Sequence, residues 1–134
     1  VMDQTMMQAN SIYIEESKIL QELAQKSDCI IVGRCANHVL REHRPLRIFV
    51  YAELEHKLER CREYAPENEQ LSDKQLRQQI ERVDKGRASY YKFVTSNSWT
   101  DKTNYDLCVN TTYASVRQVT EMLAQLSKSF FVGS

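Results

Sequence analysis

The sequence has no excess charge of either sign and no long apolar run. Its 134 residues carry 18 Lys and Arg against 18 Asp and Glu, so the formal net charge is zero. Binding along a nucleic-acid backbone needs an excess of basic charge, which argues against a general nucleic-acid binder and leaves a local basic cluster open. No apolar run approaches the roughly 20 residues of a membrane span, and no charged-then-apolar signal segment opens the chain. We therefore expect neither a nucleic acid nor a membrane as partner.

The sequence also lacks the spacings of metal-binding motifs. The three histidines are His38, His43 and His56, and the four cysteines are Cys29, Cys35, Cys61 and Cys108. No C-x-x-C pair is present and no histidine pairs with a cysteine motif, so we expect no metal site built from them. Two of the cysteines lie in apolar, strand-like runs, where a small hydrophobic side chain fits. We interpret the four as reduced core thiols of a cytoplasmic protein.

Three β-prone apolar runs alternate with amphipathic helical patterns. The runs cover residues 29–32, 47–52 and 105–110. Apolar residues three and four apart predict helices over residues 11–26, 34–42 and 54–65, from 72 onward, and over 116–126. Residues 1–10 show no clear period. This order predicts an α/β fold with a parallel sheet, in a chain long enough for one domain.

The predicted first strand, residues 29–32, leads directly into Gly33 and Arg34. A buried parallel strand carries the following side chains to its carboxyl end, where open α/β sheets bind their ligands. Arg34 in that place can hold a phosphate bidentately, and Gly33 lets ligand and backbone approach. A turn glycine followed by a solvated arginine is the alternative.

Further basic residues fall in the helices that follow. They are Arg60, Arg82, Lys85 and Arg87. Several arginines directed into one crevice suit a polyphosphate or the highly charged transition state of phosphoryl transfer, although for Arg60 a solvated helix face is favoured. Asp84 and Arg87 lie three residues apart and share a helix face, so Asp84 can pair with Arg87, orient it toward a phosphate, or accept a sugar hydroxyl.

A helix that contains an internal glycine is the candidate mobile segment. Residues 72–75 resemble a capping box, which predicts that the helix begins at Ser72. Gly86 lies within the helical pattern and costs about 1 kcal/mol against alanine. We therefore predict a mobile segment over residues 84–93.

Four stretches, taken in order, resemble the cytidylate kinase-like proteins, which are P-loop kinases related to bacterial cytidylate kinase. They are residues 30–37, 46–52 and 83–91, and Trp99 with residues 104–111. The resemblance runs from about Asp3 to the closing helix, and its combination is specific although each piece alone is weak. It implies a three-layer P-loop kinase-like parallel sheet with flanking helices, one partial domain over residues 1–134, and a helical lid at about 72–98.

The resemblance implies a nucleoside monophosphate kinase, which transfers the γ-phosphoryl group of ATP to CMP or dCMP with Mg²⁺. Arg34 matches the arginine that holds the acceptor's phosphate. Asp84 and Arg87 match lid residues, the aspartate contacting the acceptor nucleotide and the arginine a phosphate, and Arg82 is a weaker match to a further lid arginine. The resemblance thus implies that Arg34, Asp84 and Arg87 bind substrate and that Arg82 and Arg87 act in catalysis.

The chain departs from the pattern of bacterial cytidylate kinase in two ways. The Gly-Arg pair is flanked by Val32 and Cys35 instead of acidic residues, so the resemblance leaves the acceptor base open. No G-x-x-x-x-G-K-[ST] run is present, and the glycines are Gly33, Gly86 and Gly133. Because that loop supplies the N–H groups that cradle the β-phosphate, we expect transfer by a longer form of the protein and none by this chain alone.

The missing loop also bears on the predicted sheet. In P-loop kinases of this type the strand before the loop lies between the strands that match residues 29–32 and 47–52. Without it, two rows of backbone groups lack partners. Another segment supplies the strand, the remaining strands close up, or the molecule self-associates at this edge. The alternative function is a non-catalytic nucleotide-binding or regulatory interaction domain of the same fold.

Overall fold

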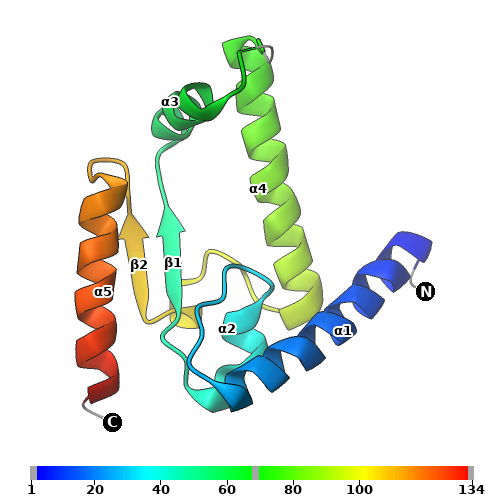
Figure 1. The fold of residues 1–134 in the computed structure, drawn as a ribbon. Coiled ribbons are helices and arrows are strands. Elements are labelled where there is room, and N and C mark those ends of the chain that lie inside the picture. Colours follow the sequence, from blue (N-terminus) through cyan, green and yellow to red (C-terminus); the bar gives the residue numbers. More distant parts are fainter. Residues whose placement is uncertain (1–2, 68–69, 133–134) are drawn as a thin grey trace.

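The computed structural model describes residues 3–67 and 70–132, and within them the fold is a mostly helical α/β arrangement (Figure 1). Its helices are α1 (Gln4–Lys26), α2 (Ala36–Val39), α3 (Leu54–Tyr64), α4 (Asp73–Thr95) and α5 (Val116–Val132). Its strands are β1 (Ile48–Tyr51) and β2 (Leu107–Asn110), and two 3₁₀ turns cover Arg41–His43 and Lys102–Asn104. The predicted α/β class is confirmed.

The sheet consists of β1 and β2, which pair in parallel with Ile48 opposite Leu107. Backbone bonds extend the pairing at both ends: Arg47 O accepts from Asp106 N and Tyr51 O accepts from Thr111 N, each at 2.8 Å. Because backbone groups alternate in direction along a strand, those of Ile48 and Val50 face away from β2. The parallel pairing of the second and third predicted runs is therefore confirmed, and one edge of β1 stays open.

A charged pair joins the two residues that directly precede β1 and β2. Arg47 binds Asp106 through its backbone N–H at 2.8 Å and through its guanidinium at 3.1 and 3.2 Å. The hydrogen bond from the Arg47 side chain, with that from its backbone, lowers the pKa of Asp106 although partial burial opposes this. The pair therefore sets the register in which the two strands begin.

The predicted strand at residues 29–32 was wrong. These residues form an irregular segment, in which Ile30 is 96% and Val32 88% exposed. The sheet that the described residues form has β1 and β2 as its two strands, and no strand pairs with this segment. β-prone residues form a strand only where a neighbouring strand pairs with them. The sheet described is thus two-stranded, short of the three strands predicted.

The best-packed part of the core joins α1 to α2. Leu20, Val39 and Leu40 are 5 to 7% exposed and form one cluster. Partly buried Tyr13, Ala24, Ile31 and Ala36 pack against it. The amide of Gln21 donates to the carbonyl of Val39 at 2.8 Å, which satisfies a group at the end of the short α2. Helix α1 starts earlier than its apolar pattern predicts because Asp3 caps it, accepting from Met6 N at 2.8 Å.

Helix α4 begins as predicted and then runs further. Ser72 and Gln75 form the reciprocal capping box, at 3.2 and 3.0 Å. The helix continues through Gly86 to Thr95 without a break. Buried Tyr91, 5% exposed, anchors the part beyond the glycine, and such packing outweighs the low propensity of a single residue. The predicted change of character at Gly86 therefore does not interrupt the helix.

The cysteines are less buried than predicted. All four are free thiols, but Cys29, Cys61 and Cys108 are exposed and Cys35 alone is buried. Cys29 is exposed because its segment is not a strand, and Cys61 and Cys108 line the cleft described below. The prediction of core thiols is thus correct only for Cys35. Of the helices within the described ranges, none combines the length and the apolar character that a membrane span requires.

Candidate functional site

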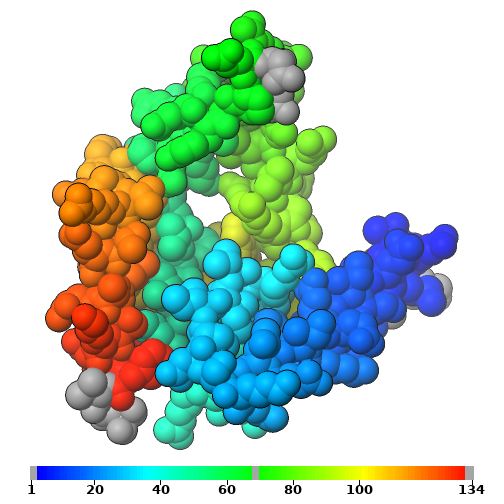
Figure 2. All heavy atoms as spheres, in the orientation of Figure 1, coloured from blue at the N-terminus to red at the C-terminus, as the bar shows by residue number. Residues whose placement is uncertain are grey.

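A cleft of about 1860 Å³ lies between the β1–α3 side of the molecule and α4 (Figures 1 and 2). The space-filling view shows it as an opening between these elements. Among the described residues, five basic and two acidic side chains line it: Lys57, Arg60, Arg62, Arg87, Lys102, Glu67 and Asp84. A neutral chain therefore concentrates positive charge on one concave surface, which favours an anionic ligand.

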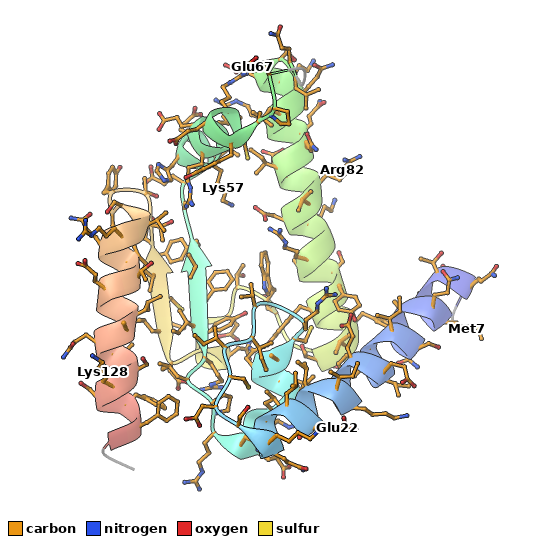
Figure 3. The ribbon with its side chains drawn as sticks, in the orientation of Figure 1. Met7, Glu22, Lys57, Glu67, Arg82 and Lys128 are labelled. Atoms are coloured by element: carbon orange, nitrogen blue, oxygen red, sulfur yellow. The ribbon has the colours of Figure 1, made fainter. Side chains whose placement is uncertain are left out.

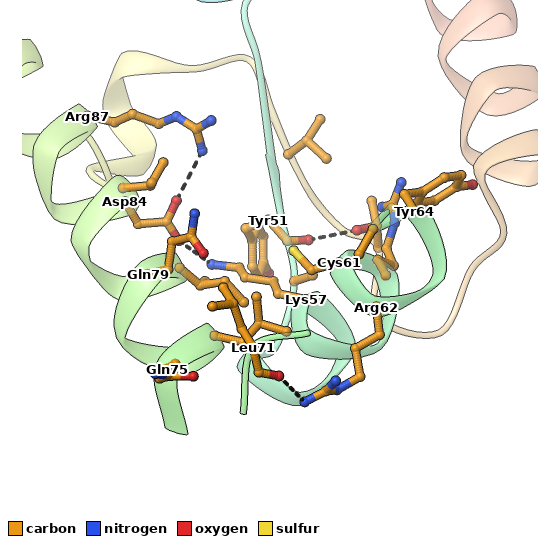
Figure 4. Close-up of a pocket in the computed structure, with 18 of the residues that line it drawn as sticks. Tyr51, Lys57, Cys61, Arg62, Tyr64, Leu71, Gln75, Gln79, Asp84 and Arg87 are labelled. Carbon is orange, nitrogen blue, oxygen red and sulfur yellow. Dashed lines mark hydrogen bonds and ion pairs between the residues drawn. The ribbon is translucent and has the colours of Figure 1, made fainter. Parts of the chain in front are cut away.

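Asp84 holds two cations in the cleft. Its Oδ2 accepts from Lys57 Nζ at 2.7 Å, and its Oδ1 accepts from Arg87 Nη1 at 3.2 Å. Lys57 reaches the carboxylate from α3, whereas Arg87 lies one turn further along α4 (Figure 4). The side chains of Lys57 and Asp84 are 34% and 28% exposed, and that of Arg87 is 63% exposed. Both cations thus stay open to the cleft.

An aromatic cluster forms the wall of the cleft on the sheet side. The ring of Phe49 lies edge-on to Trp99 at 5.3 Å, and 4.9 Å from that of Tyr105. Tyr51, two residues along β1, points to the same face, and its ring is 6.1 Å from that of Phe49. Phe49, Tyr51 and Trp99 all line the cleft. Such a wall can stack against a planar ring.

Helices α3 and α4 contact each other, and two further ion pairs link them. Arg77 pairs with Glu55 at 2.5 Å, and Arg62 pairs with Asp73. Arg62 also donates to the carbonyl of Leu71 at 3.4 Å. These pairs are largely exposed and individually weak, but with Lys57 and Asp84 they link the two helices at three points.

Arg34 lies outside the cleft. Gly33, Arg34 and Cys35 all have positive φ, at 72, 61 and 53°, so the chain makes a left-handed turn there. Arg34 Nη1 donates to Glu16 Oε1 of α1 at 2.9 Å, and the Arg34 side chain is 64% exposed. Burial raises the pKa of Tyr90, the residue of α4 one turn beyond Arg87, and the charge of Arg34 partly offsets this.

The predicted lid residues lie on two different sides of α4. Asp84 and Arg87 line the cleft and contact each other, as their spacing predicts. Arg82 points away from the sheet on the outer side of the helix (Figure 3). The structure therefore brings together two of the four predicted residues, and their roles stay predictions.

The sequence did not single out Lys57, Lys102 or the aromatic wall, and it favoured a solvated Arg60. All of these side chains line the cleft. Two rules would have found part of this set. Lys57 follows the carboxyl end of a predicted strand within about one helical turn, and Phe49 and Tyr51 alternate along that strand onto one face.

The described residues do not fit a metal centre of their own. No three His, Cys, Asp or Glu side chains in the described ranges converge on one point. Mg²⁺ is commonly held by one or two carboxylates together with substrate phosphates. The cleft carboxylate of Asp84 is already occupied by Lys57 and Arg87. The described side chains would therefore not hold a metal ion by themselves.

Comparison with known proteins identifies the family. The model of the cytidylate kinase-like family matches residues 1–113. The chain belongs to the cytidylate kinase-like family. A crystal structure of an uncharacterized protein from Eubacterium ventriosum resembles this family member, with 26% identity and a TM-score of 0.79 over 88% of this chain. The chain spans 65% of the length of that protein. No functionally curated protein matches it.

Proposed function

We propose that this family member binds a nucleoside monophosphate in the cleft between β1 and α4. The observation that supports this is the pairing of Lys57 and Arg87 around Asp84, opposite an aromatic wall. Aromatic faces bind bases by stacking, and ammonium and guanidinium groups bind phosphate oxygens. Family membership points to a nucleotide ligand of the same kind.

In this proposal the ligands are CMP or dCMP, and Arg34, Asp84 and Arg87 bind them. Arg87 contacts a phosphate and Asp84 accepts a hydroxyl or amine hydrogen of the nucleoside. Arg34 joins them by exchanging Glu16 for the phosphate of the acceptor. That exchange is inexpensive because the Arg34–Glu16 pair is exposed, and exposed pairs contribute only about 0 to 1 kcal/mol.

The full-length protein then acts as a nucleoside monophosphate kinase. An oxygen of the acceptor's phosphate attacks the γ-phosphorus of ATP, the bond to the β–γ bridging oxygen breaks, and ADP leaves. Charge spreads over the oxygens of the transferred group, where the guanidinium of Arg87 stabilises it. A part for Arg82 in catalysis is proposed from the family resemblance alone, because its side chain points away from the sheet (Figure 3). Mg²⁺, when bound with ATP, supplies further charge neutralisation.

The open edge of β1 supports a proposal about partners. The backbone groups of Ile48 and Val50 face away from β2, and Val50 is 54% exposed. We propose that this edge pairs with another strand. When no other segment supplies that strand, a second copy of the chain supplies it. Light scattering of the 134-residue chain should then give a dimer, and Val50→Lys, a substitution that blocks edge pairing, should give a monomer.

Calorimetry and a coupled assay test the proposed function. The chain should bind CMP, and Arg87→Ala should weaken that binding about 10-fold because a charged hydrogen bond is lost. The full-length protein should release ADP from ATP only when a nucleoside monophosphate is present. Binding of CMP without turnover in the full-length protein would favour the alternative, a non-catalytic nucleotide-binding domain. No binding of CMP, dCMP, UMP or AMP would refute the proposal.

Four free thiols are consistent with a cytoplasmic location.

A further inference from the structure

Lys57 is the cation in the cleft that neither the sequence pattern nor the family resemblance assigns to a role. It stands in the first turn of α3, just beyond the carboxyl end of β1, and it points across the cleft toward α4 (Figures 3 and 4). Its Nζ lies 2.7 Å from Asp84 Oδ2, and its side chain is 34% exposed. A lysine held in a concave site by a single carboxylate is placed to meet a second anion.

The two cations around Asp84 keep most of their hydrogen-bonding capacity. A lysine ammonium has three N–H donors and a guanidinium five. Within the described part of the chain, Asp84 is the hydrogen-bond acceptor found for Lys57 and also for Arg87. Because one carboxylate spans both nitrogens, a phosphate group, with oxygens at comparable spacing, can take the same place between them.

We propose that Lys57 is a phosphate-binding residue of the cleft, and that Asp84 holds Lys57 and Arg87 ready for a nucleotide phosphate. This rests on the proposed function and extends it to a residue on a second helix. When the phosphate enters, it replaces Asp84 as the shared partner of Lys57 and Arg87. The carboxylate of Asp84 is then free to accept a hydrogen from the nucleoside, so that phosphate and nucleoside recognition are coupled.

The same geometry keeps α3 linked to α4 when a phosphate is bound. Of the three cross-helix pairs, Lys57–Asp84 is the one in which both side chains line the cleft, because Glu55, Arg77 and Asp73 are not among the residues that line it. A phosphate between Lys57 and Arg87 keeps α3 and α4 linked while the carboxylate is released. The linkage between the helices thus persists in the bound state with a new shared anion.

The test uses the change in affinity for inorganic pyrophosphate and for CMP, measured by calorimetry. Lys57→Ala should weaken pyrophosphate binding about 10-fold, because a charged hydrogen bond is lost. Asp84→Asn should strengthen it several-fold, because the carboxylate no longer competes with the phosphate for the two cations. For CMP, Asp84→Asn should strengthen binding less than it does for pyrophosphate, because the neutral amide oxygen is a weaker acceptor for the nucleoside than the carboxylate. Lys57→Arg should retain pyrophosphate binding within about 3-fold.

The opposite signs separate a ligand from a structural role. If Lys57 served only to tie α3 to α4, Lys57→Ala and Asp84→Asn would both break the tie and would both weaken pyrophosphate binding. Lys128→Ala removes the same charge from α5, outside the cleft, and should leave binding within about 2-fold (Figure 3). Circular dichroism confirms that each variant is folded.

Failure of this inference can be told apart from failure of the proposed function. Suppose that the unsubstituted chain binds CMP, and that Lys57→Ala and the unsubstituted chain bind pyrophosphate with the same affinity. Then Lys57 is not a phosphate ligand and the proposed function stands. If the unsubstituted chain binds neither CMP nor pyrophosphate, both are overturned.

Discussion

Asn37 of α2 donates through Nδ2 to the hydroxyl oxygen of Tyr91 on α4, at 2.9 Å, across 54 residues of sequence. The same amide lies 3.3 Å from the carbonyl oxygen of Asn104, in the 3₁₀ turn before β2. One side chain therefore joins three segments that the chain order keeps apart. It anchors the carboxyl-terminal part of α4 one turn beyond Arg87, whereas the residues of α4 that line the cleft lie between Gln75 and Arg87.

The Asn37 bridge gives the first prediction. Asn37→Ala should lower the free energy of unfolding by about 1 kcal/mol, because the hydroxyl of buried Tyr91 loses a donor. Tyr91→Phe removes the other partner. In urea denaturation the two changes together should cost less than the sum of the single effects, with a coupling of about 0.5 to 1.5 kcal/mol. Additive effects would contradict the bridge.

The Arg47–Asp106 pair predicts how stability depends on pH. Hydrogen bonds from Arg47 lower the pKa of Asp106 in the folded chain. A group with a lowered folded pKa stabilises the fold above its unfolded pKa, about 3.9 for aspartate, and loses that effect as pH falls through the folded value. Asp106→Asn should therefore destabilise the chain by about 1 kcal/mol at pH 7.

The difference between Asp106→Asn and the unsubstituted chain should be constant from about pH 5 to 8 and shrink below about pH 4. Thermal denaturation across this range measures it. A matched variant is Asp101→Asn: among the described residues, the side chain of Asp101 accepts hydrogen bonds from Thr103 alone, within its own turn. Asp101→Asn should change stability less at neutral pH. A difference for Asp106→Asn that grows on acidification would contradict the role of the pair.

Thiol reactivity provides the third prediction. Burial, with the nearby carboxylate of Glu16, raises the pKa of the Cys35 thiol to about 11. The other three cysteines are exposed. Because the thiolate is the reactive form, iodoacetamide at pH 8 should modify three cysteines rapidly and Cys35 slowly, as followed by mass spectrometry. Denaturant should make all four react alike, and a fast Cys35 in the folded chain would overturn its burial.

The local elements could be predicted from the sequence because their determinants are local. Ser72 and Gln75 lie within one turn, and their capping box forms as predicted. Asp84 and Arg87 are three residues apart, and helix geometry alone brings them together. The run 47–52 also forms a strand, because residues 107–110 are available to pair with it.

What failed depends on contacts between distant segments. Residues 29–32 have the composition of a strand, but strand formation requires a neighbouring edge, which their own sequence does not encode. Lys57 and Asp84 are 27 residues apart, and their contact follows from the way α3 packs on α4. The placement of Arg34 beside Glu16 follows from a left-handed turn over three residues, two of which are not glycine.

The two described glycines give a prediction with opposite signs. Gly86 lies inside α4, and a Cβ atom built there meets nothing within 4 Å. Gly86→Ala should therefore raise the free energy of unfolding by about 1 kcal/mol, because alanine has the higher helix propensity and the unfolded chain loses conformational freedom. Gly33 has equal room but a φ of +72°, which L side chains rarely adopt. Gly33→Ala should lower stability by about 1 kcal/mol.

Each glycine variant is the control for the other, because both add one methyl group at a site with open space. Urea denaturation measures both differences. A loss of stability in Gly86→Ala would contradict the continuous helix through that residue. If Gly33→Ala were as stable as the unsubstituted chain, the left-handed turn that carries Arg34 to Glu16 would not be the native conformation.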